Sequence, residues 1–188
     1  MLTRLFVLWY RLKGWKVKGT IPPGITKCVV IAAPHTSNWD FVYSLATFQI
    51  LNLPVHYLAK KELFKFPLKE LLKATGGIPV IRSKSMNLVE TIVEKFNQSE
   101  HLYLMIPAEG TRKRVEKWKS GFYYAALGAK IPILLGFLDY KNKESGFGEV
   151  LYPSGDIQKD LAIIKNFYKT KTGKNHELFN IEAVRFDA

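Results

Sequence analysis

The chain has 188 residues, of which 47% are hydrophobic and 23% are charged, which is the composition of a globular protein and excludes a disordered one. Its 28 lysine and arginine residues outnumber 16 acidic residues, giving a formal net charge of +12. An anionic partner is therefore expected: nucleic acid, an anionic membrane surface, or an acidic ligand such as a phosphorylated metabolite or acyl carrier protein.

The length predicts one domain spanning residues 1–188. The single cysteine, Cys28, cannot form an internal disulfide or a thiolate metal cluster, and we infer a reducing compartment, the cytoplasm. The four histidines lie at no ligand-like spacing, so no metal is expected. No apolar run reaches the length of a membrane-spanning helix, and no transmembrane span is predicted.

Residues 1–13 form the first predicted helix. Leucine, phenylalanine and tryptophan alternate there with Arg4, Arg11 and Lys13, a pattern typical of a helix that lies in the headgroup region of a membrane. A signal peptide would continue into a small-residue cleavage site, whereas this segment is followed by basic residues, so a signal peptide is not predicted. An ordinary first helix packed on the core fits the same pattern, so both interpretations stay open.

A histidine and an aspartate lie five positions apart at the next junction between strand and helix. The apolar run 27–33 is typical of a strand buried on both faces, so His35 lies at its carboxyl end, the edge where ligands bind in open α/β sheets. Residues five apart on one helix point away from each other, so His35 and Asp40 can meet only if residues 36–38 turn. Asp40 then falls in the first turn of a helix from Trp39, where the helix dipole favours a carboxylate.

Held by Asp40 through one ring nitrogen, His35 can present the other nitrogen to a substrate hydroxyl as a general base. A histidine that ends a strand and an aspartate that caps a helix give the same pattern without any chemistry. The pair alone leaves both interpretations open.

Strands and helices alternate along the rest of the chain, and the tail 173–188 carries no clear signal. This alternation predicts the α/β class, with a mostly parallel or mixed central sheet flanked by helices in a single domain. The predicted strands are 15–19, 27–33, 54–60, 78–81, 101–107, 131–138 and 147–152, and the predicted helices after the first are 39–51, 68–74, 85–97, 121–129 and 156–171.

Three of these strands end in polar groups, which we expect to converge at one edge of the sheet. Gly110 allows a backbone to approach a ligand closely, and Arg112 offers a planar fork suited to phosphate or carboxylate. Arg82 can add a second donor. An arginine alone is commonly a solvated surface group, whereas a histidine base beside two arginines indicates a site.

Four motifs occur in the order that is found in the glycerolipid acyltransferases. The segment 34–40, PHTSNWD, resembles their H-x4-D box, and 76–82, GGIPVIR, is similar to the block G-x-I-x-I-x-R. The segment 109–112 matches E-G-T-R, and the proline in 131–133 resembles that of the fourth block. The chain thus resembles the family of 1-acylglycerol-3-phosphate acyltransferase.

The resemblance implies transfer of a fatty acyl group from an acyl thioester, carried by acyl carrier protein or coenzyme A, to a lipid hydroxyl, with no further cofactor. His35 would deprotonate the hydroxyl and Asp40 would orient the imidazolium. The acceptor headgroup would be bound by Arg82, Glu109, Gly110, Thr111 and Arg112, and backbone amides near Gly76 and Gly77 or Gly110 are expected to stabilise the oxyanion.

Departures from the family pattern bear on the acceptor. Pro34, Ile81 and Leu135 stand where the family often has asparagine, an acidic residue and a second proline. A lysophospholipid such as 1-acylglycerol-3-phosphate is the expected acceptor, and the hydroxyl of an aminolipid or another non-phosphate acceptor is the alternative. Phe41, Leu45 and Phe48 are candidates to line an acyl channel, and they also fit an ordinary helix core.

A different class of interpretation is a non-catalytic basic protein that binds membranes. The motifs favour the enzyme, with acyl carrier protein or coenzyme A thioester, a lipid acceptor and an anionic membrane surface as partners and with peripheral association to the membrane. No nucleic-acid-binding motif is recognised, so nucleic acid is not an expected partner.

Overall fold

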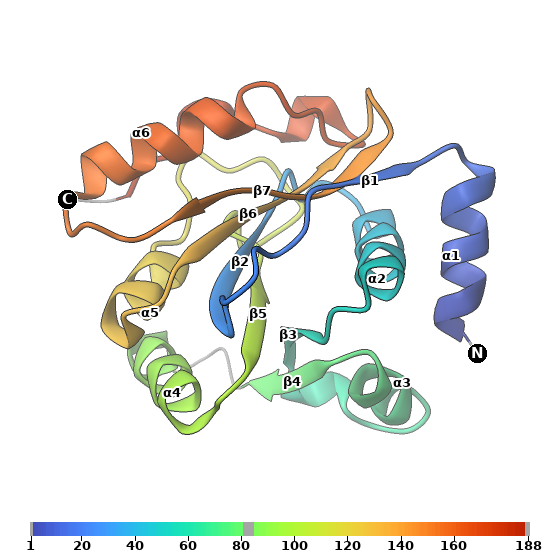
Figure 1. The fold of residues 1–188 in the computed structure, drawn as a ribbon, viewed down its shortest axis with the longest axis horizontal. Helices are drawn as coiled ribbons and strands as arrows, with labels where there is room; N and C mark the ends of the chain where they lie inside the picture. Colours follow the sequence, from blue (N-terminus) through green and yellow to red (C-terminus); the bar gives the residue numbers. More distant parts are fainter. Residues whose placement is uncertain (1, 81–84, 187–188) are drawn as a thin grey trace.

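The computed structural model describes residues 2–80 and 85–186, and within them seven strands form one mixed sheet (Figure 1). The strand order is β1-β7-β6-β2-β5-β3-β4. All neighbouring pairs are parallel except β6 and β7, which are antiparallel. The strands are β1 (Lys16–Lys18), β2 (Lys27–Ala33), β3 (Val55–Lys60), β4 (Gly77–Val80), β5 (Leu102–Ile106), β6 (Ile133–Asp139) and β7 (Glu144–Leu151).

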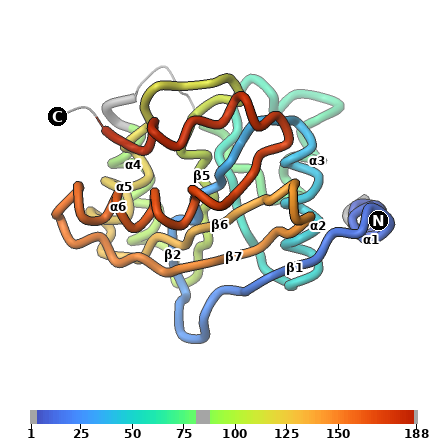
Figure 2. Tube along the Cα trace, turned by 90° about the horizontal axis from the view of Figure 1, so that it is seen from above, coloured from blue at the N-terminus to red at the C-terminus, as the bar shows by residue number. Residues whose placement is uncertain are grey.

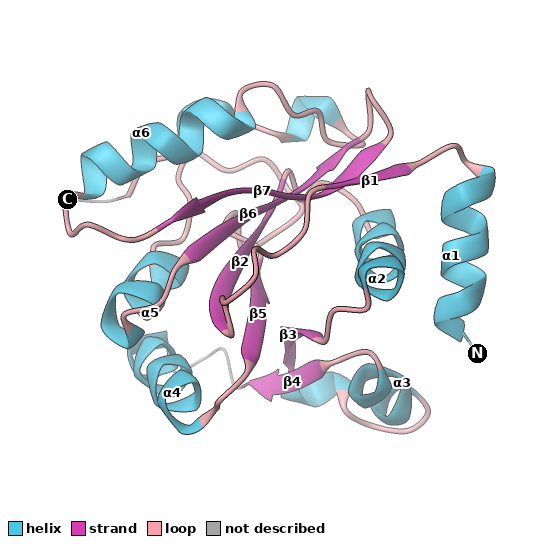
Figure 3. Cartoon of the chain, in the orientation of Figure 1, coloured by secondary structure: helices cyan, strands magenta, loops and turns pink. Residues whose placement is uncertain are grey.

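Helices cover both faces of the sheet, as the secondary-structure colouring of Figure 3 shows. One face carries α1 (Leu2–Leu12), α2 (Trp39–Leu51) and α3 (Leu68–Ala74), and the other carries α4 (Ser85–Gln98), α5 (Gly121–Ala129) and α6 (Ile157–Tyr168). Three short 3-10 helices, η1 (Lys61–Leu63), η2 (His176–Leu178) and η3 (Ile181–Ala183), complete the described elements. The predicted α/β class is confirmed.

The order of the strands places a crevice at the carboxyl ends of β2 and β5. The chain leaves β2 through α2 to reach β3 on one side, and it leaves β5 through α5 to reach β6 on the other side of β2. Right-handed crossovers in opposite directions put α2 and α5 on opposite faces. The loops after β2 and β5 therefore meet at a topological switch point, where ligands bind in open α/β sheets.

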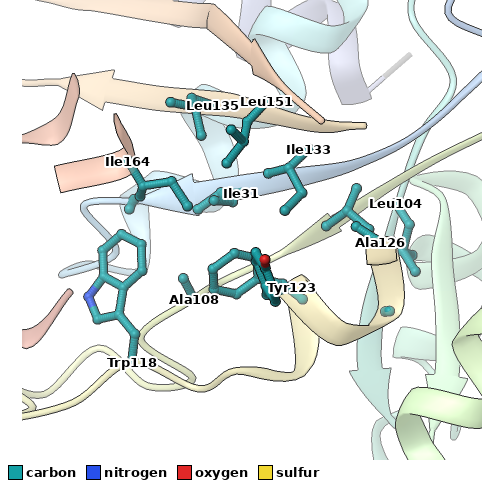
Figure 4. Packing of buried hydrophobic residues seen from close by; sticks show 14 of the residues in the cluster. Ile31, Leu104, Ala108, Trp118, Tyr123, Ala126, Ile133, Leu135, Leu151 and Ile164 are labelled. Atoms are coloured by element: carbon teal, nitrogen blue, oxygen red, sulfur yellow. The ribbon is translucent and has the colours of Figure 1, made fainter. Parts of the chain in front are cut away.

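The larger core lies between the sheet and helices α4, α5 and α6 (Figure 4). Ile31 and Leu104 reach into it from the two central strands, and Trp118 and Tyr123 pack beneath them. The opposite face has a second core, where Cys28 and Val30 of β2 contact Leu45 and Phe48 of α2. Alternate residues of β2 thus face opposite cores, as expected of a strand buried on both faces.

Helix α1 has one buried and one exposed face. Tyr10 is 1% exposed, and its hydroxyl forms a 2.8 Å hydrogen bond with the hydroxyl of Ser145 in β7. The outer face carries Leu5, Leu8 and Leu12, which are 58%, 55% and 74% exposed. None of the helices in the part of the chain that the structure describes has the length and hydropathy that a bilayer crossing requires.

The tail, for which we predicted no structure, packs against the site and the larger core. Residues 173–186 contain η2 and η3, and Ala183 and Val184 are buried. The side-chain amide of Asn175 donates to the carbonyl oxygen of Thr36 at 2.8 Å, next to His35. Seen from above, the red tail runs back over the sheet from α6, far from the N-terminus beside α1 (Figure 2).

Candidate active site

His35 and Asp40 are in contact, as their spacing predicts. Nδ1 of His35 lies 3.2 Å from Oδ2 of Asp40, and the histidine side chain is 21% exposed. Asp40 is the second residue of α2, in its first turn, and only 4% exposed. The turn between them forms because the amides of Thr36 and Ser37 both donate to Asp40 Oδ2, each at 2.9 Å.

These bonds determine how the imidazole can work. Because Asp40 Oδ2 is an acceptor, a neutral His35 in contact with it carries its proton on Nδ1. The other nitrogen, Nε2, is then unprotonated and can accept a proton from a substrate hydroxyl. Residue 38 holds the N-cap position of α2 without a side-chain cap hydrogen bond. The amide of Trp39, the first residue of the helix, donates to Ser37 Oγ at 3.2 Å, and Asp40 accepts the two amides that precede the helix.

Tyr140 is a partner of Asp40 that we did not predict. It follows β6, and its hydroxyl donates to Asp40 Oδ1 at 2.7 Å. Burial and the neighbouring Asp40 charge raise the pKa of Tyr140 well above its usual range, so the phenol stays protonated and serves as a donor. Its ring packs edge-on against Trp15 and Tyr43. In the sequence, Tyr140 could have been singled out because it comes directly after a strand that ends at the same edge of the sheet as the strand before His35.

Glu109 lies beneath His35 and does not line the cavity. It is 2% exposed, and its Oε2 accepts a hydrogen bond from the backbone N–H of His35 at 2.6 Å. Burial raises the pKa of Glu109 to about 8, with the His35 amide opposing and the charge of Asp40 adding to the shift. We expected this residue to bind the acceptor headgroup, whereas the structure gives it a supporting position that joins the ends of β5 and β2.

The rest of the E-G-T-R segment is exposed. Gly110 has a φ of +69°, which favours glycine, but its amide donates to the carbonyl of Pro107 at 3.0 Å and so is not directed at a substrate oxyanion. Thr111 is exposed and accepts from the Lys113 amide at 3.3 Å. Of this segment, Arg112 lines the cavity beside His35.

Gly76 and Gly77, which we expected to help stabilise the oxyanion, are not among the residues that line the cavity with His35. Gly76 immediately precedes β4 and Gly77 is its first residue, and β4 runs parallel to β3, β5 and β2. They therefore lie at the amino end of β4, level with the middle of β2, whereas His35 follows the carboxyl end of β2. Gly76 is needed there for packing, because a Cβ at that position would lie 2.6 Å from the carbonyl oxygen of Val55. Arg82, the last residue of this motif, lies outside the described residues.

A cavity of about 520 Å³ extends from His35 between α2 and the sheet. Phe41 and Phe48 of α2 line it, whereas Leu45 lines a separate cavity of about 580 Å³ at the amino ends of the strands. The mouth includes Lys60, which together with Arg112 places two cations at the cavity. Further lining residues that motif comparison did not indicate are Ser37, Asn38, Ser44, Tyr57, Leu63, Leu72 and Met105.

Comparison with known proteins agrees with this arrangement. The crystal structure of the 1-acyl-sn-glycerophosphate (LPA) acyltransferase PlsC from Thermotoga maritima is similar, with a TM-score of 0.60 and 17% identity over 92% of this chain and 81% of that chain. No curated protein sequence matches significantly. The model of the acyltransferase family matches residues 16–134, which is more than half of the sequence. On this match, and with a fold that agrees, the chain belongs to the acyltransferase family.

Proposed function

We propose that this acyltransferase transfers a fatty acyl group from an acyl thioester to the hydroxyl of a lysophospholipid such as 1-acylglycerol-3-phosphate, with His35 as the general base. The observation that carries the proposal is the 3.2 Å contact between His35 Nδ1 and Asp40 Oδ2 at the head of the cavity. It leaves Nε2 of the imidazole as the proton acceptor.

The chemistry follows from that geometry. Nε2 of His35 takes the proton of the acceptor hydroxyl while the oxygen attacks the thioester carbonyl. The buried carboxylate of Asp40 stabilises the imidazolium that forms. When the tetrahedral intermediate collapses, the carbon–sulfur bond breaks and the imidazolium returns its proton to the leaving thiolate. The side chains of Ser37 and Asn38, which also line the cavity, are the nearest candidates to donate a hydrogen bond to the oxyanion.

The cavity separates an apolar and a cationic region, which suits a substrate with an acyl chain and an anionic headgroup. Phe41, Phe48 and Met105 supply an apolar wall for the acyl chain. Lys60 and Arg112 are exposed cations at its mouth, and they favour an acceptor that carries a phosphate. The two cations support a phosphorylated acceptor over the non-phosphate alternative.

We further propose that the donor is acyl carrier protein or coenzyme A thioester and that the protein binds peripherally to anionic membranes through α1. Supporting the membrane contact, the outer face of α1 exposes Leu5, Leu8 and Leu12 together with Arg4 and Arg11. The net charge of +12 suits both an acidic carrier protein and an anionic bilayer.

The test incubates the purified protein with a labelled acyl thioester, on carrier protein or on coenzyme A, and with a panel of acceptors that includes lysophosphatidate and hydroxylated aminolipids. We expect acylation of lysophosphatidate, and a loss of about 10²-fold or more in rate for His35→Ala, which removes the base. Circular dichroism of the variant controls for folding. Full activity of His35→Ala, or acylation of the aminolipids alone, would contradict the proposal.

A further inference from the structure

The segment 60–69, which we call the mouth segment, exposes apolar side chains that the fold does not need. It runs from the end of β3 through η1 to the first turn of α3. Phe66 is 96% exposed, Leu63 is 45% exposed and Leu68 is 46% exposed. A phenylalanine that is almost entirely in water costs free energy unless another surface covers it.

Basic residues surround these apolar side chains. Lys60, Lys61, Lys65 and Lys69 are all exposed, with Glu62 as the acidic residue of the segment. Apolar side chains among lysines match the chemistry of an anionic lipid surface, where the apolar groups enter the acyl region and the ammonium groups remain among the phosphates.

The mouth segment is also part of the cavity wall. Lys60 and Leu63 line the cavity that holds His35, and Leu72 of α3 continues that wall. A surface that covered Phe66 would therefore lie at the opening of the cavity.

We propose that the mouth segment is a second membrane-contact site, in which Phe66 and Leu68 enter an anionic bilayer and the lysines contact lipid phosphates, so that the cavity opens directly onto the lipid surface. The inference rests on the proposed lipid substrates, since it gives them a route to His35 without passage through water. This proposed membrane contact lies in a part of the chain that is far from α1 in the sequence.

Two observations favour a bilayer over an acidic carrier protein as the occupant. The side chain of Phe66 protrudes into solvent, and a protruding apolar side chain inserts readily into a fluid bilayer. An acidic carrier protein could be bound by the lysines alone and would not require Phe66. In addition, α1 and α3 lie on the same side of the sheet in both views (Figures 1 and 2), so the proposed contact of α1 and that of the mouth segment belong to one side of the molecule.

The binding test measures sedimentation of the full chain with vesicles of phosphatidylcholine, with and without phosphatidylglycerol. We expect Phe66→Ser to lower the partition coefficient about tenfold on both kinds of vesicle. The double variant Lys65→Gln, Lys69→Gln should lower the partition coefficient about fivefold for each lysine, and only on the vesicles that contain phosphatidylglycerol. Tyr152→Ser, which alters a tyrosine 67% exposed at the end of β7, is the matched control and should bind as the unaltered chain does.

The activity test separates the inference from the proposed function. Phe66→Ser should lose activity on vesicle-embedded acceptor in proportion to its lost binding and keep full activity with short-chain, monomeric substrates. Unchanged vesicle binding by both variants overturns the inference. A raised KM for acyl carrier protein thioester, with vesicle binding unchanged, also overturns it and would mean that the mouth segment binds the carrier protein. If the unaltered chain transfers no acyl group, the proposed function fails, and the sedimentation result still decides the membrane contact.

Discussion

Each oxygen of the buried Asp40 carboxylate has a donor that fixes its position. Oδ2 receives the amides of Thr36 and Ser37 and contacts His35, and Oδ1 receives the hydroxyl of Tyr140. A buried carboxylate is costly without such partners, and here the partners also orient the imidazole. In the proposed mechanism Tyr140 acts through Asp40 and is therefore a positioning residue.

Replacing Tyr140 with phenylalanine should slow acyl transfer without unfolding the protein. The change leaves Asp40 Oδ1 without this donor, at a cost of about 1–3 kcal/mol, so we expect kcat to fall on the order of tenfold with little change in the KM of either substrate. Steady-state kinetics on vesicle-embedded acceptor measure this.

Tyr43→Phe is the matched control for that experiment. Tyr43 packs against Tyr140 with ring centroids 5.6 Å apart, and no hydrogen bond between Tyr43 and Asp40 occurs among the described residues. It should keep an unaltered kcat. Equal losses in the two variants would mean that the hydrogen bond from Tyr140 to Asp40 is not what supports the rate.

The contact between His35 and Asp40 could be predicted because it is local: five residues, a turn and a helix start determine it. The roles of Tyr140 and Glu109 could not, because they depend on which strands are neighbours. Tyr140 lies 100 residues from Asp40, and Glu109 lies 74 residues from His35. The family motif pointed to Glu109 but not to its burial, which only the packing of β5 beside β2 creates.

The bounds of some elements were predicted to the residue, and those of others were not. Helices 68–74 and 121–129 agree with α3 and α5, whereas β7 begins at Glu144, three residues before its predicted start. Residues 173–186 have short 3-10 turns and irregular chain, which leave no period to detect.

Helix α1 packs on the core, as one of its two sequence interpretations predicts, and the membrane interpretation stays a prediction. Its inner side carries Tyr10 into the core, and its Trp9 ring stacks on Trp39 at 5.6 Å, directly beside Asp40. Its outer side remains apolar and exposed. Deleting residues 1–13 would therefore remove core packing together with any membrane contact, and a surface change is the cleaner test.

The double variant Leu8→Ser, Leu12→Ser should weaken binding to anionic vesicles about tenfold or more, because both side chains would otherwise be buried in lipid. Its melting temperature should stay close to that of the unaltered chain, since the two leucines are 55% and 74% exposed in the folded protein. Leu127→Ser on α5, on the far face of the sheet, is the control. Unchanged vesicle sedimentation of the double variant would remove α1 from the proposed membrane surface.

At the scale of the whole molecule, the site is held together by hydrogen bonds between elements that are far apart in the sequence. Glu109 links the end of β5 to the end of β2, Tyr140 links β6 to α2, and Asn175 links the tail to the turn at Thr36. The catalytic geometry proposed here thus depends on the sheet being fully assembled. The stability of the fold and the state of the site should respond together to pH.

The pKa of Glu109 determines in which direction stability changes with pH. Its pKa in the folded protein is about 8, against an ordinary value of 4.5, so between these values the folded chain holds a proton that the unfolded chain releases. Raising the pH from about 4.5 to about 8 therefore favours unfolding, and stability should fall through this window by a few kcal/mol at about 1.4 kcal/mol per pKa unit. Above pH 8 the contribution is constant.

Glu109→Gln isolates the effect, because glutamine keeps an oxygen that can accept the His35 amide but does not titrate. Urea unfolding from pH 5 to pH 9 should show the unaltered chain losing stability relative to this variant as pH rises to about 8, and a constant difference beyond it. Glu109→Ala, which removes the acceptor and leaves a cavity, should be less stable than the glutamine variant at every pH. Parallel profiles for the unaltered chain and Glu109→Gln would mean that Glu109 titrates at the same pH folded and unfolded, and that its burial is offset by the bond to His35.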